Sequence, residues 1–191
     1  MSLRKFSNLR EISVLFRDYV VPKIGKRHLD FGCGSGFGTV IEALERPDSK
    51  IIGYDTNQSI VSRALEFDLD NLGFTFSKTN LEKFQFDSAS ANFVLHEDIN
   101  ILAELHSLLL PGAIVCVLDY NLKGSSSRRF RKSFCSDNER RVMKREGLRA
   151  CYEKHTALGV GDCVRIGAST GFENVLAHAS ENYFVWVGKV N

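Results

Sequence analysis

At 191 residues, 43% apolar and with a net charge of +2, the chain has the size and composition of one soluble domain with a sizeable core. It has no run of 18 apolar residues and no apolar signal core near its N-terminus, so we expect neither a membrane span nor a secretory leader. Its five cysteines are odd in number and form no Cys-x-x-Cys pair, which indicates no disulfide framework and no metal site and favours a cytoplasmic location.

The first half of the chain alternates predicted helices and strands. Apolar residues at helical spacing predict an amphipathic helix over 6–20, which Pro22 ends. Short apolar runs predict three strands, and capping residues and proline delimit the helices between them. The predicted strands are 28–31, 50–54 and 74–77, and the predicted helices are 39–45 and one from Thr56–Asn57 to about Leu72.

The second half continues this alternation. A strand is predicted at 86–91, followed by a helix over 99–110 that stops at Pro111-Gly112. The continuous apolar run 113–118 predicts a strand buried on both faces. Beyond it, a capping box at Ser136-x-x-Glu139 predicts a helix start, a second helix is expected at 162–170, and 175–179 with 183–190 predicts a closing hairpin.

Alternating strands and helices predict an α/β fold with a doubly wound, mostly parallel sheet and helices on both faces. We expect one domain over 1–191, with a basic insertion or lid at 123–154 between the fifth strand and the C-terminal helix. Ligands bind such sheets outside the carboxyl ends of the strands. The polar residues expected at these ends are Asp30, Asp55, Asn80, Asn92 and Asp119.

The segment HLDFGCGSGFG, residues 28–38, carries the sharpest signal of the chain. Glycines at 32, 34, 36 and 38 follow Asp30 and precede a predicted helix. Glycine accepts positive φ and lets a ligand lie against the backbone, and a helix start offers free N–H groups to an anionic group. This combination predicts a nucleotide-type site. The dinucleotide fingerprint G-x-G-x-x-G fails because Phe37 and Thr39 stand where its last glycine should be, which disfavours a nicotinamide-dependent oxidoreductase.

The pattern D-x-G-x-G-x-G over 30–36 resembles motif I of the class I S-adenosylmethionine-dependent methyltransferases. FDSASANFVLHE, LAELHSLLLPGAIVCVLDY and the C-terminal HTALGVGDCVRIGASTGF with NYFVWVGK resemble later segments of their type 11 branch, in the right order. The resemblance covers about residues 25–122 and 155–190. It implies a Rossmann-like seven-stranded sheet with an antiparallel last strand, and S-adenosylmethionine as the cofactor.

The resemblance also implies roles for individual residues. Asp30 and the glycine loop would meet the amino-acid end of the cofactor, Asp55 its ribose hydroxyls, and Asn80 with Leu81 its adenine. Asn80 stands where the family often has Asp. Asp55 can alternatively be a helix cap, and Cys33 a packing residue. The expected cofactor-binding residues are Asp30, Gly32, Cys33, Gly34, Gly36, Asp55, Thr56, Asn80, Leu81 and Asn92.

The acceptor is less constrained. Asn92, His96 and Tyr120 are the candidate catalytic residues. The resemblance implies acceptor-side residues after the fourth strand, where Asn92 and His96 lie, and Tyr120 ends the fifth strand, where it can line the acceptor pocket. A small molecule is the expected acceptor. The segment 123–154 carries eleven Lys/Arg and four Asp/Glu, so RNA or protein is an alternative acceptor. A non-catalytic module that supports a partner subunit is a further alternative, and the oligomeric state stays open.

Overall fold

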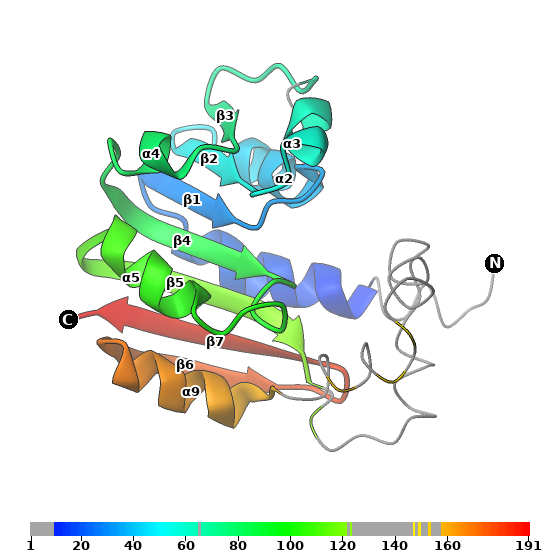
Figure 1. The fold of residues 1–191 in the computed structure, drawn as a ribbon, viewed down its shortest axis with the longest axis vertical. Coiled ribbons are helices and arrows are strands. Elements are labelled where there is room, and N and C mark those ends of the chain that lie inside the picture. Colours follow the sequence, from blue (N-terminus) through cyan, green and yellow to red (C-terminus); the bar gives the residue numbers. More distant parts are fainter. Residues whose placement is uncertain are drawn as a thin grey trace.

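A seven-stranded sheet forms the centre of the structure (Figure 1). The computed structural model describes residues 10–64, 66–121, 123, 147, 149, 153 and 158–191. The strand order is β3-β2-β1-β4-β5-β7-β6, in which β1 to β5 pair in parallel and β7 runs antiparallel to β5 and β6. This confirms the predicted sheet with its reversed last strand. The strands are β1 (Arg27–Phe31), β2 (Lys50–Tyr54), β3 (Leu72–Thr75), β4 (Phe86–Asn92), β5 (Leu109–Tyr120), β6 (Phe172–Ala179) and β7 (Tyr183–Val190).

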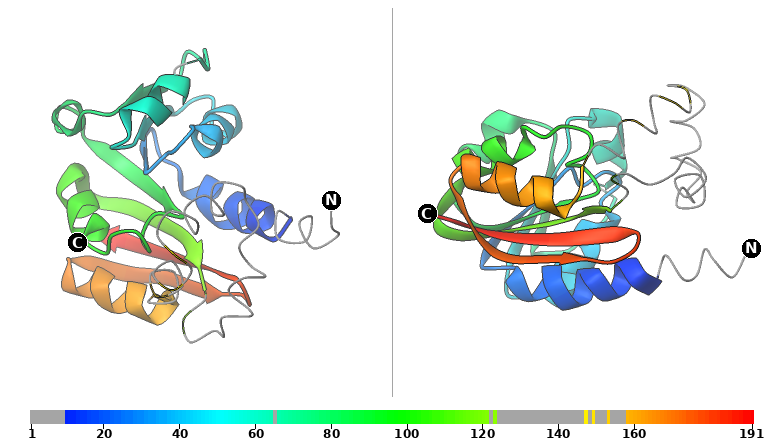
Figure 2. Two further views of the ribbon diagram at one scale, coloured as in Figure 1. Left: turned by 45° about the vertical axis from the view of Figure 1, so that its right-hand side comes forward. Right: turned by 90° about the horizontal axis from the view of Figure 1, so that it is seen from below.

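Helices cover both faces of this sheet. Figure 2 shows α5 and α9 on one face and the N-terminal helix on the other. The N-terminal helix is described from residue 10, and it continues into the π-helical turn η1 and the 3₁₀ turn η2. The remaining bounds are η1 (Phe16–Val20), η2 (Val21–Lys23), α2 (Phe37–Glu45), α3 (Gln58–Ala64), α4 (Lys78–Leu81), α5 (Ile101–Leu108) and α9 (Val160–Ser169).

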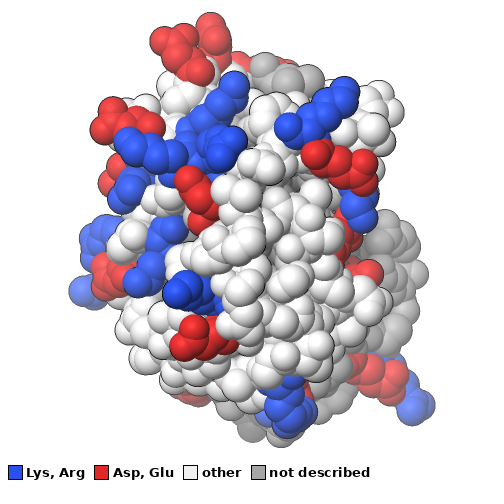
Figure 3. All heavy atoms as spheres, turned by 90° about the vertical axis from the view of Figure 1, so that its left-hand side faces the viewer, with Lys and Arg blue, Asp and Glu red and all other residues white. Residues whose placement is uncertain are grey.

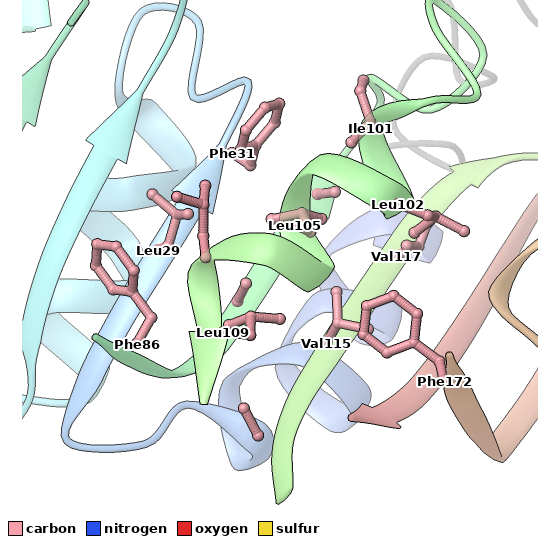
Figure 4. Packing of buried hydrophobic residues seen from close by; sticks show 14 of the residues in the cluster. Leu29, Phe31, Phe86, Ile101, Leu102, Leu105, Leu109, Val115, Val117 and Phe172 are labelled. Carbon is pink, nitrogen blue, oxygen red and sulfur yellow. The ribbon is translucent and has the colours of Figure 1, made fainter. Parts of the chain in front are cut away.

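Strand β5 supplies side chains to the core on both faces of the sheet. Val115 and Val117 point to one face, toward Leu102 and Leu105 of α5 (Figure 4). Cys116 and Leu118 point to the other, toward Leu15 and Val20 of the N-terminal helix segment. Successive side chains of a strand alternate between faces, so a continuous apolar run marks a strand covered twice. The prediction for 113–118 is confirmed.

The helix predicted from Thr56–Asn57 to Leu72 is shorter than expected. Its start is confirmed, because Asn57 Oδ1 accepts a hydrogen bond of 3.2 Å from the Ser59 N–H. The described helix ends at Ala64, and Leu72 already belongs to β3. Asn71 explains the difference: its Nδ2 donates to the carbonyls of Ala43, Arg46 and Ser49 near the end of α2, at 3.0–3.3 Å. This tertiary contact fixes the segment before β3 as a loop, which local helical periodicity does not reveal.

Pro111-Gly112 lies inside β5 and not between a helix and a strand. Leu109 pairs with Phe86 and Ile114 with Ser88, so the strand bulges between these two pairs. Gly112 has φ +81°, which suits a bulge. Helix α5 therefore ends at Leu108, two residues earlier than predicted.

Pro22 changes the last turns of the N-terminal helix. Proline has no N–H and its ring crowds the carbonyl four residues earlier, which lies in the π-helical turn. The predicted α-helix to Val20 thus loses its α geometry at Phe16.

Other boundaries differ by a few residues. β3 begins and ends two residues before the predicted strand, α2 and α9 begin two residues earlier, and β6 begins at Phe172. The start of the first helix at 6–9, the capping box at Ser136–Glu139 and most of the basic segment 123–154 lie outside the described residues. None of the described helices combines the length and apolar character that a membrane span requires.

The sheet order reverses between β1 and β4, which creates the switch point where doubly wound sheets bind ligands. The carboxyl ends of the parallel strands lie on the right of Figure 1. Figure 3 shows the opposite edge, where basic and acidic side chains are intermixed around an uncharged centre. The functional site is therefore expected at the carboxyl edge of β1 and β4.

Candidate functional site

The glycine loop after β1 requires its glycines. Gly32, Gly34 and Gly36 have φ values of +78°, +54° and +79°, which L side chains rarely adopt. The N–H groups of Gly32 and Cys33 donate to the Tyr54 carbonyl at 2.7 and 2.9 Å, so the loop is tied to the end of β2.

Space around the three glycines differs. A Cβ on Gly32 would lie 2.7 Å from Val94, and a Cβ on Gly36 would lie 2.8 Å from Phe74. A Cβ on Gly34 would meet nothing within 4 Å. The middle of the loop thus presents open backbone, while its two ends are packed. An open glycine backbone is what close approach of a ligand needs.

Asp55 lies against this loop, as the motif predicts. Its Oδ2 accepts a hydrogen bond of 3.0 Å from the Gly34 N–H, and its Oδ1 accepts one of 2.9 Å from the Asn57 N–H. Asp55 therefore holds its own turn and the glycine loop together. A carboxylate oxygen has two lone pairs, so each oxygen can accept a further hydroxyl proton. Thr56 is exposed, in the bend between Asp55 and Asn57.

Asp30 lies buried at the carboxyl end of β1, with 2% of its surface exposed. Its Oδ2 accepts a hydrogen bond of 2.6 Å from the Thr39 hydroxyl, and its Oδ1 one of 3.3 Å from the Ser90 hydroxyl. Burial raises the pKa of Asp30 well above its usual range, and the nearby charge of Glu42 raises it further. A nearby cation would therefore stabilise the ionised form of Asp30.

A cavity of about 500 Å³ opens beside Asp30, between the N-terminal helix and α2. This volume lies within the usual range of small-molecule sites. Most of its walls are apolar, and its polar lining residues come from the N-terminal helix, the end of β1, α2 and the end of β4. The lining residues are Ile12, Ser13, Phe16, Arg17, Val21, Asp30, Gly32, Cys33, Phe37, Gly38, Ile41, Glu45, Asn92 and Phe93.

Asn92 brings an unsatisfied amide to this cavity. Its Oδ1 and Nδ2 are both buried, and neither makes a hydrogen bond of normal geometry to the residues that the structure describes, although the amide lies close enough to Asp30 to lower the pKa of that carboxyl. A buried polar group without a partner costs about 1–3 kcal/mol. The next residue, Phe93, has φ +58°, a strained conformation of the kind that gathers at functional sites. Both features are of a kind that gathers at functional sites.

Six of the ten expected cofactor residues do not line the cavity. Gly34, Gly36, Asp55 and Thr56 belong to the glycine loop and to the turn after β2, and Asn80 and Leu81 belong to α4. Asn80 is exposed in α4, with its Nδ2 3.5 Å from the Thr75 Oγ1, and Leu81 is fully buried in the core. Neither lines the cavity. Cys33 does line it, but burial and then the charges of Asp30 and Asp55 raise the pKa of its thiol, which suits a packing residue.

The two other catalytic candidates form a separate cluster. His96 Nδ1 lies 2.7 Å from Asp119 Oδ1, and the Tyr120 ring packs edge-on against the imidazole at 5.3 Å. Burial lowers the pKa of His96, but the Asp119 and Glu97 carboxylates raise it more, to about 9. Neither His96 nor Tyr120 is among the residues that line the cavity.

Sequence reasoning missed Glu42 and the cavity walls. Glu42 was not singled out in the sequence, yet it is 0% exposed beside Asp30. Phe37 lines the cavity at the start of α2 and is 71% exposed. An apolar residue directly after the glycine loop was a weak signal for this role. The predicted absence of a metal stays a prediction: among the described residues, no three His, Cys, Asp or Glu side chains form a metal-ligating group.

The basic segment is described at four positions only, and two of them are basic. Lys123 contacts Asp162 at 2.6 Å, and Arg149 contacts Glu153 at 2.8 Å. Both basic groups thus already face carboxylates. The other basic residues of 123–154 lie outside the described residues.

Comparison with known proteins agrees with this architecture. A family model described as "Methyltransferase domain" matches residues 22–177. No curated protein matches the chain by sequence. Similar solved structures include a SAM-dependent methyltransferase from Aquifex aeolicus, with 16% identity, 100% of both chains covered and a TM-score of 0.68.

Two further similar structures belong to proteins whose names give different activities. The plantazolicin methyltransferase BpumL in complex with SAH has 14% identity and a TM-score of 0.62, over 98% of this chain and 84% of that one. The [4+2]-cyclase SpnF has 15% identity and a TM-score of 0.68, over 94% and 80%. One fold thus serves more than one chemistry, so the acceptor must be argued from the site.

The family model covers most of the chain, and the sheet order with its reversed strand β7 is the one expected from the motif I resemblance. The chain belongs to the methyltransferase domain family, as a class I enzyme whose methyl donor is S-adenosylmethionine.

Proposed function

We propose that the enzyme methylates a small, largely apolar molecule held between the N-terminal helix and α2. The cavity of about 500 Å³ carries this proposal, because it joins the motif I loop to a set of apolar walls. Phe16, Phe37 and Ile41 supply these walls. Aromatic and aliphatic linings bind apolar bodies, and a few polar groups fix their orientation.

Within this proposal the cofactor lies across the ends of β1 and β2. Asp30 faces its ammonium group, the open backbone at Gly34 meets its amino-acid end, and Asp55 accepts from its ribose hydroxyls. Asn80 in α4 is the candidate for the adenine. Support comes from the unpacked side of Gly34 and from the free lone pairs of Asp55.

Asn92 is the group that we assign to the acceptor's polar head. Bound S-adenosylmethionine supplies an electrophilic methyl group, and in-line displacement then depends mainly on the orientation of the acceptor atom. The Asn92 amide, which lines the cavity, offers N–H donors and a carbonyl acceptor to an incoming polar group. His96 is not assigned as a base, because its raised pKa keeps it protonated at neutral pH.

We place the enzyme in the cytoplasm. The described cysteines Cys33, Cys116 and Cys163 are free thiols, two of them fully buried, which suits a reducing compartment.

Two aspartate substitutions in α2 test the acceptor site. Ile41 lines the cavity, whereas Leu44 is 62% exposed on the same helix and does not line it. The uncharged fluorophore N-phenyl-1-naphthylamine should bind the wild type and Leu44→Asp equally, and Ile41→Asp at least about tenfold more weakly, because burying a charge is costly. S-adenosylhomocysteine, titrated calorimetrically, should bind all three within about twofold.

Equal fluorophore binding by Ile41→Asp and Leu44→Asp would remove the cavity from the acceptor site. Loss of S-adenosylhomocysteine binding in Ile41→Asp alone would instead mean that the cofactor, and not the acceptor, contacts the Ile41 wall of the cavity. An acceptor screen then uses the same pair, with a raised KM expected only for Ile41→Asp.

A further inference from the structure

A buried polar cluster lies directly beneath the glycine loop. Six polar residues from β1, α2 and β4 meet there, each no more than 2% exposed. An apolar interior normally excludes such a group unless it is paired and functional. The members are His28, Asp30, Thr39, Glu42, Ser88 and Ser90.

Ser90 connects the two carboxyl groups of this cluster. Its hydroxyl lies 2.8 Å from Glu42 Oε1 and 3.3 Å from Asp30 Oδ1. A hydroxyl carries one proton, so between two charged carboxylates it can only divide that proton in a weaker three-centre hydrogen bond. The second carboxyl makes a full hydrogen bond to Ser90 only if it carries a proton itself. The geometry therefore favours one shared proton between Asp30 and Glu42.

We propose that Glu42 is a positioning residue that keeps a proton on Asp30 in the free enzyme, and that the cofactor's ammonium group displaces this proton when it binds. The inference rests on the proposed function, in which Asp30 receives that ammonium group. Asp30 borders the cavity, whereas Glu42 does not line it, so a ligand's cation reaches Asp30 first.

The surroundings of Asp30 leave Glu42 as the decisive neighbour. β4 contributes the uncharged Ser90 and Asn92, and α2 contributes Thr39 with Glu42. The remaining titratable groups that face Asp30 or share its cavity are His28 on β1, Cys33 in the loop, Arg17 on the N-terminal helix and Glu45 at the end of α2.

These neighbours do not take over the effect of Glu42 on the protonation of Asp30. His28 Nε2 lies 3.5 Å from Glu42 Oε2 and 3.1 Å from Ser90 Oγ, so its ring contacts the cluster on the side of Glu42. Arg17 is exposed and already contacts Asp18 at 3.2 Å. Burial and the charge of Glu42 both raise the pKa of Asp30, in agreement with a retained proton.

Proton release on ligand binding is the direct test. S-adenosylhomocysteine carries the same ammonium group, and its binding enthalpy is measured in two buffers of different ionisation enthalpy between pH 5.5 and 8. The wild type should release up to about one proton per ligand, and its Kd should weaken by up to about tenfold per pH unit on acidification below the pKa of Asp30. In Glu42→Gln, proton release should fall and the Kd should depend less on pH.

Controls separate this coupling from structural damage. Asp48→Asn, in the exposed turn after α2 and outside the cavity lining, should behave as the wild type, and Glu42→Asp should restore part of the proton release. Asp30→Asn should bind more weakly, release no proton and show no pH dependence. Unchanged proton release in Glu42→Gln would overturn the inference while leaving the cofactor assignment intact.

A second measurement covers the case in which the cofactor assignment itself fails. If the folded wild type binds no S-adenosylhomocysteine at any pH, the proposed function is wrong. The retained proton is still measurable, because a carboxyl with a raised pKa lowers the free energy of unfolding as pH rises above about 4. This decline should be smaller in Glu42→Gln, and an identical decline in both proteins would refute the Asp30–Glu42 coupling.

Discussion

Asp119 holds His96 through two hydrogen bonds, one to the backbone and one to the ring. Its Oδ2 accepts from the His96 N–H at 3.0 Å, and its Oδ1 lies 2.7 Å from Nδ1. The pair ties the turn after β4 to the end of β5, and both side chains are almost fully buried. A buried imidazolium–carboxylate pair couples the protonation of His96 to the stability of this turn.

We therefore predict that the enzyme loses stability as pH rises above neutral. The pKa of His96 is raised from 6.5 to about 9, so the stabilisation is complete below about 6.5 and is lost as pH rises through 9. The difference corresponds to on the order of 3 kcal/mol. Urea denaturation at pH 6 and pH 9.5 measures it.

Asp119→Asn should be less stable at pH 6 and should show little of this decline. His178→Gln is the control, because His178 is exposed on β6 and only stacks on Tyr19. Equal declines in the wild type and Asp119→Asn would mean that another group titrates in this range.

The glycine loop gives a second prediction, on stability. Gly36→Ala combines positive φ with a Cβ 2.8 Å from Phe74 and 2.9 Å from Ala64, so it should lower the free energy of unfolding by about 2–4 kcal/mol. Gly34→Ala adds its Cβ to open space and should cost only about 1–2 kcal/mol, from the backbone alone.

The same two variants separate packing from ligand contact. Gly34→Ala should weaken S-adenosylhomocysteine binding in a protein that is still folded, because its methyl group projects where the loop is open. If Gly34→Ala bound the ligand as tightly as the wild type, the open side of the loop would not be the cofactor surface.

The sheet and the motif I loop were predictable because their signals are local. The run 113–118 is apolar at every position, and Asp30 is followed by glycines at every second position, so few conformations satisfy either segment. The family model and the sheet order confirm the fold that these segments indicate.

The cavity and the buried cluster were not predictable because they depend on tertiary contacts. Nothing in the sequence separates Glu42, which is 0% exposed, from Glu45, which is exposed three residues later. Likewise Asn71 ends a predicted helix by bonding carbonyls more than twenty residues away. Such contacts override local propensity and leave no periodic trace in the chain.

Cys33 provides a third prediction, on reactivity. Burial and the charges of Asp30 and Asp55 raise the pKa of its thiol, so almost no thiolate exists at pH 8. Cys33 should react with iodoacetamide more slowly than a free cysteine in the unfolded chain, as peptide mass spectrometry can measure. Cys33→Ala should retain cofactor binding, and fast alkylation of Cys33 would contradict its burial in the folded loop.

Asp55→Ala gives the fourth prediction, on cofactor affinity. The substitution removes a carboxylate that accepts from Gly34 and Asn57 and that we assign to the ribose hydroxyls. A hydrogen bond to a charged group contributes about 1.5–3 kcal/mol, so calorimetry should show S-adenosylhomocysteine binding weakened by about tenfold or more.

The Asp55→Ala chain should stay folded, because Asp55 is only half-buried. Asp48→Ala, in an exposed turn, should change neither the folding of the chain nor its affinity for S-adenosylhomocysteine. Asp55→Asn keeps one acceptor oxygen, and its affinity for S-adenosylhomocysteine should lie between those of the wild type and Asp55→Ala. If Asp55→Ala bound the ligand as the wild type does, Asp55 would be only a brace between the glycine loop and the turn after β2.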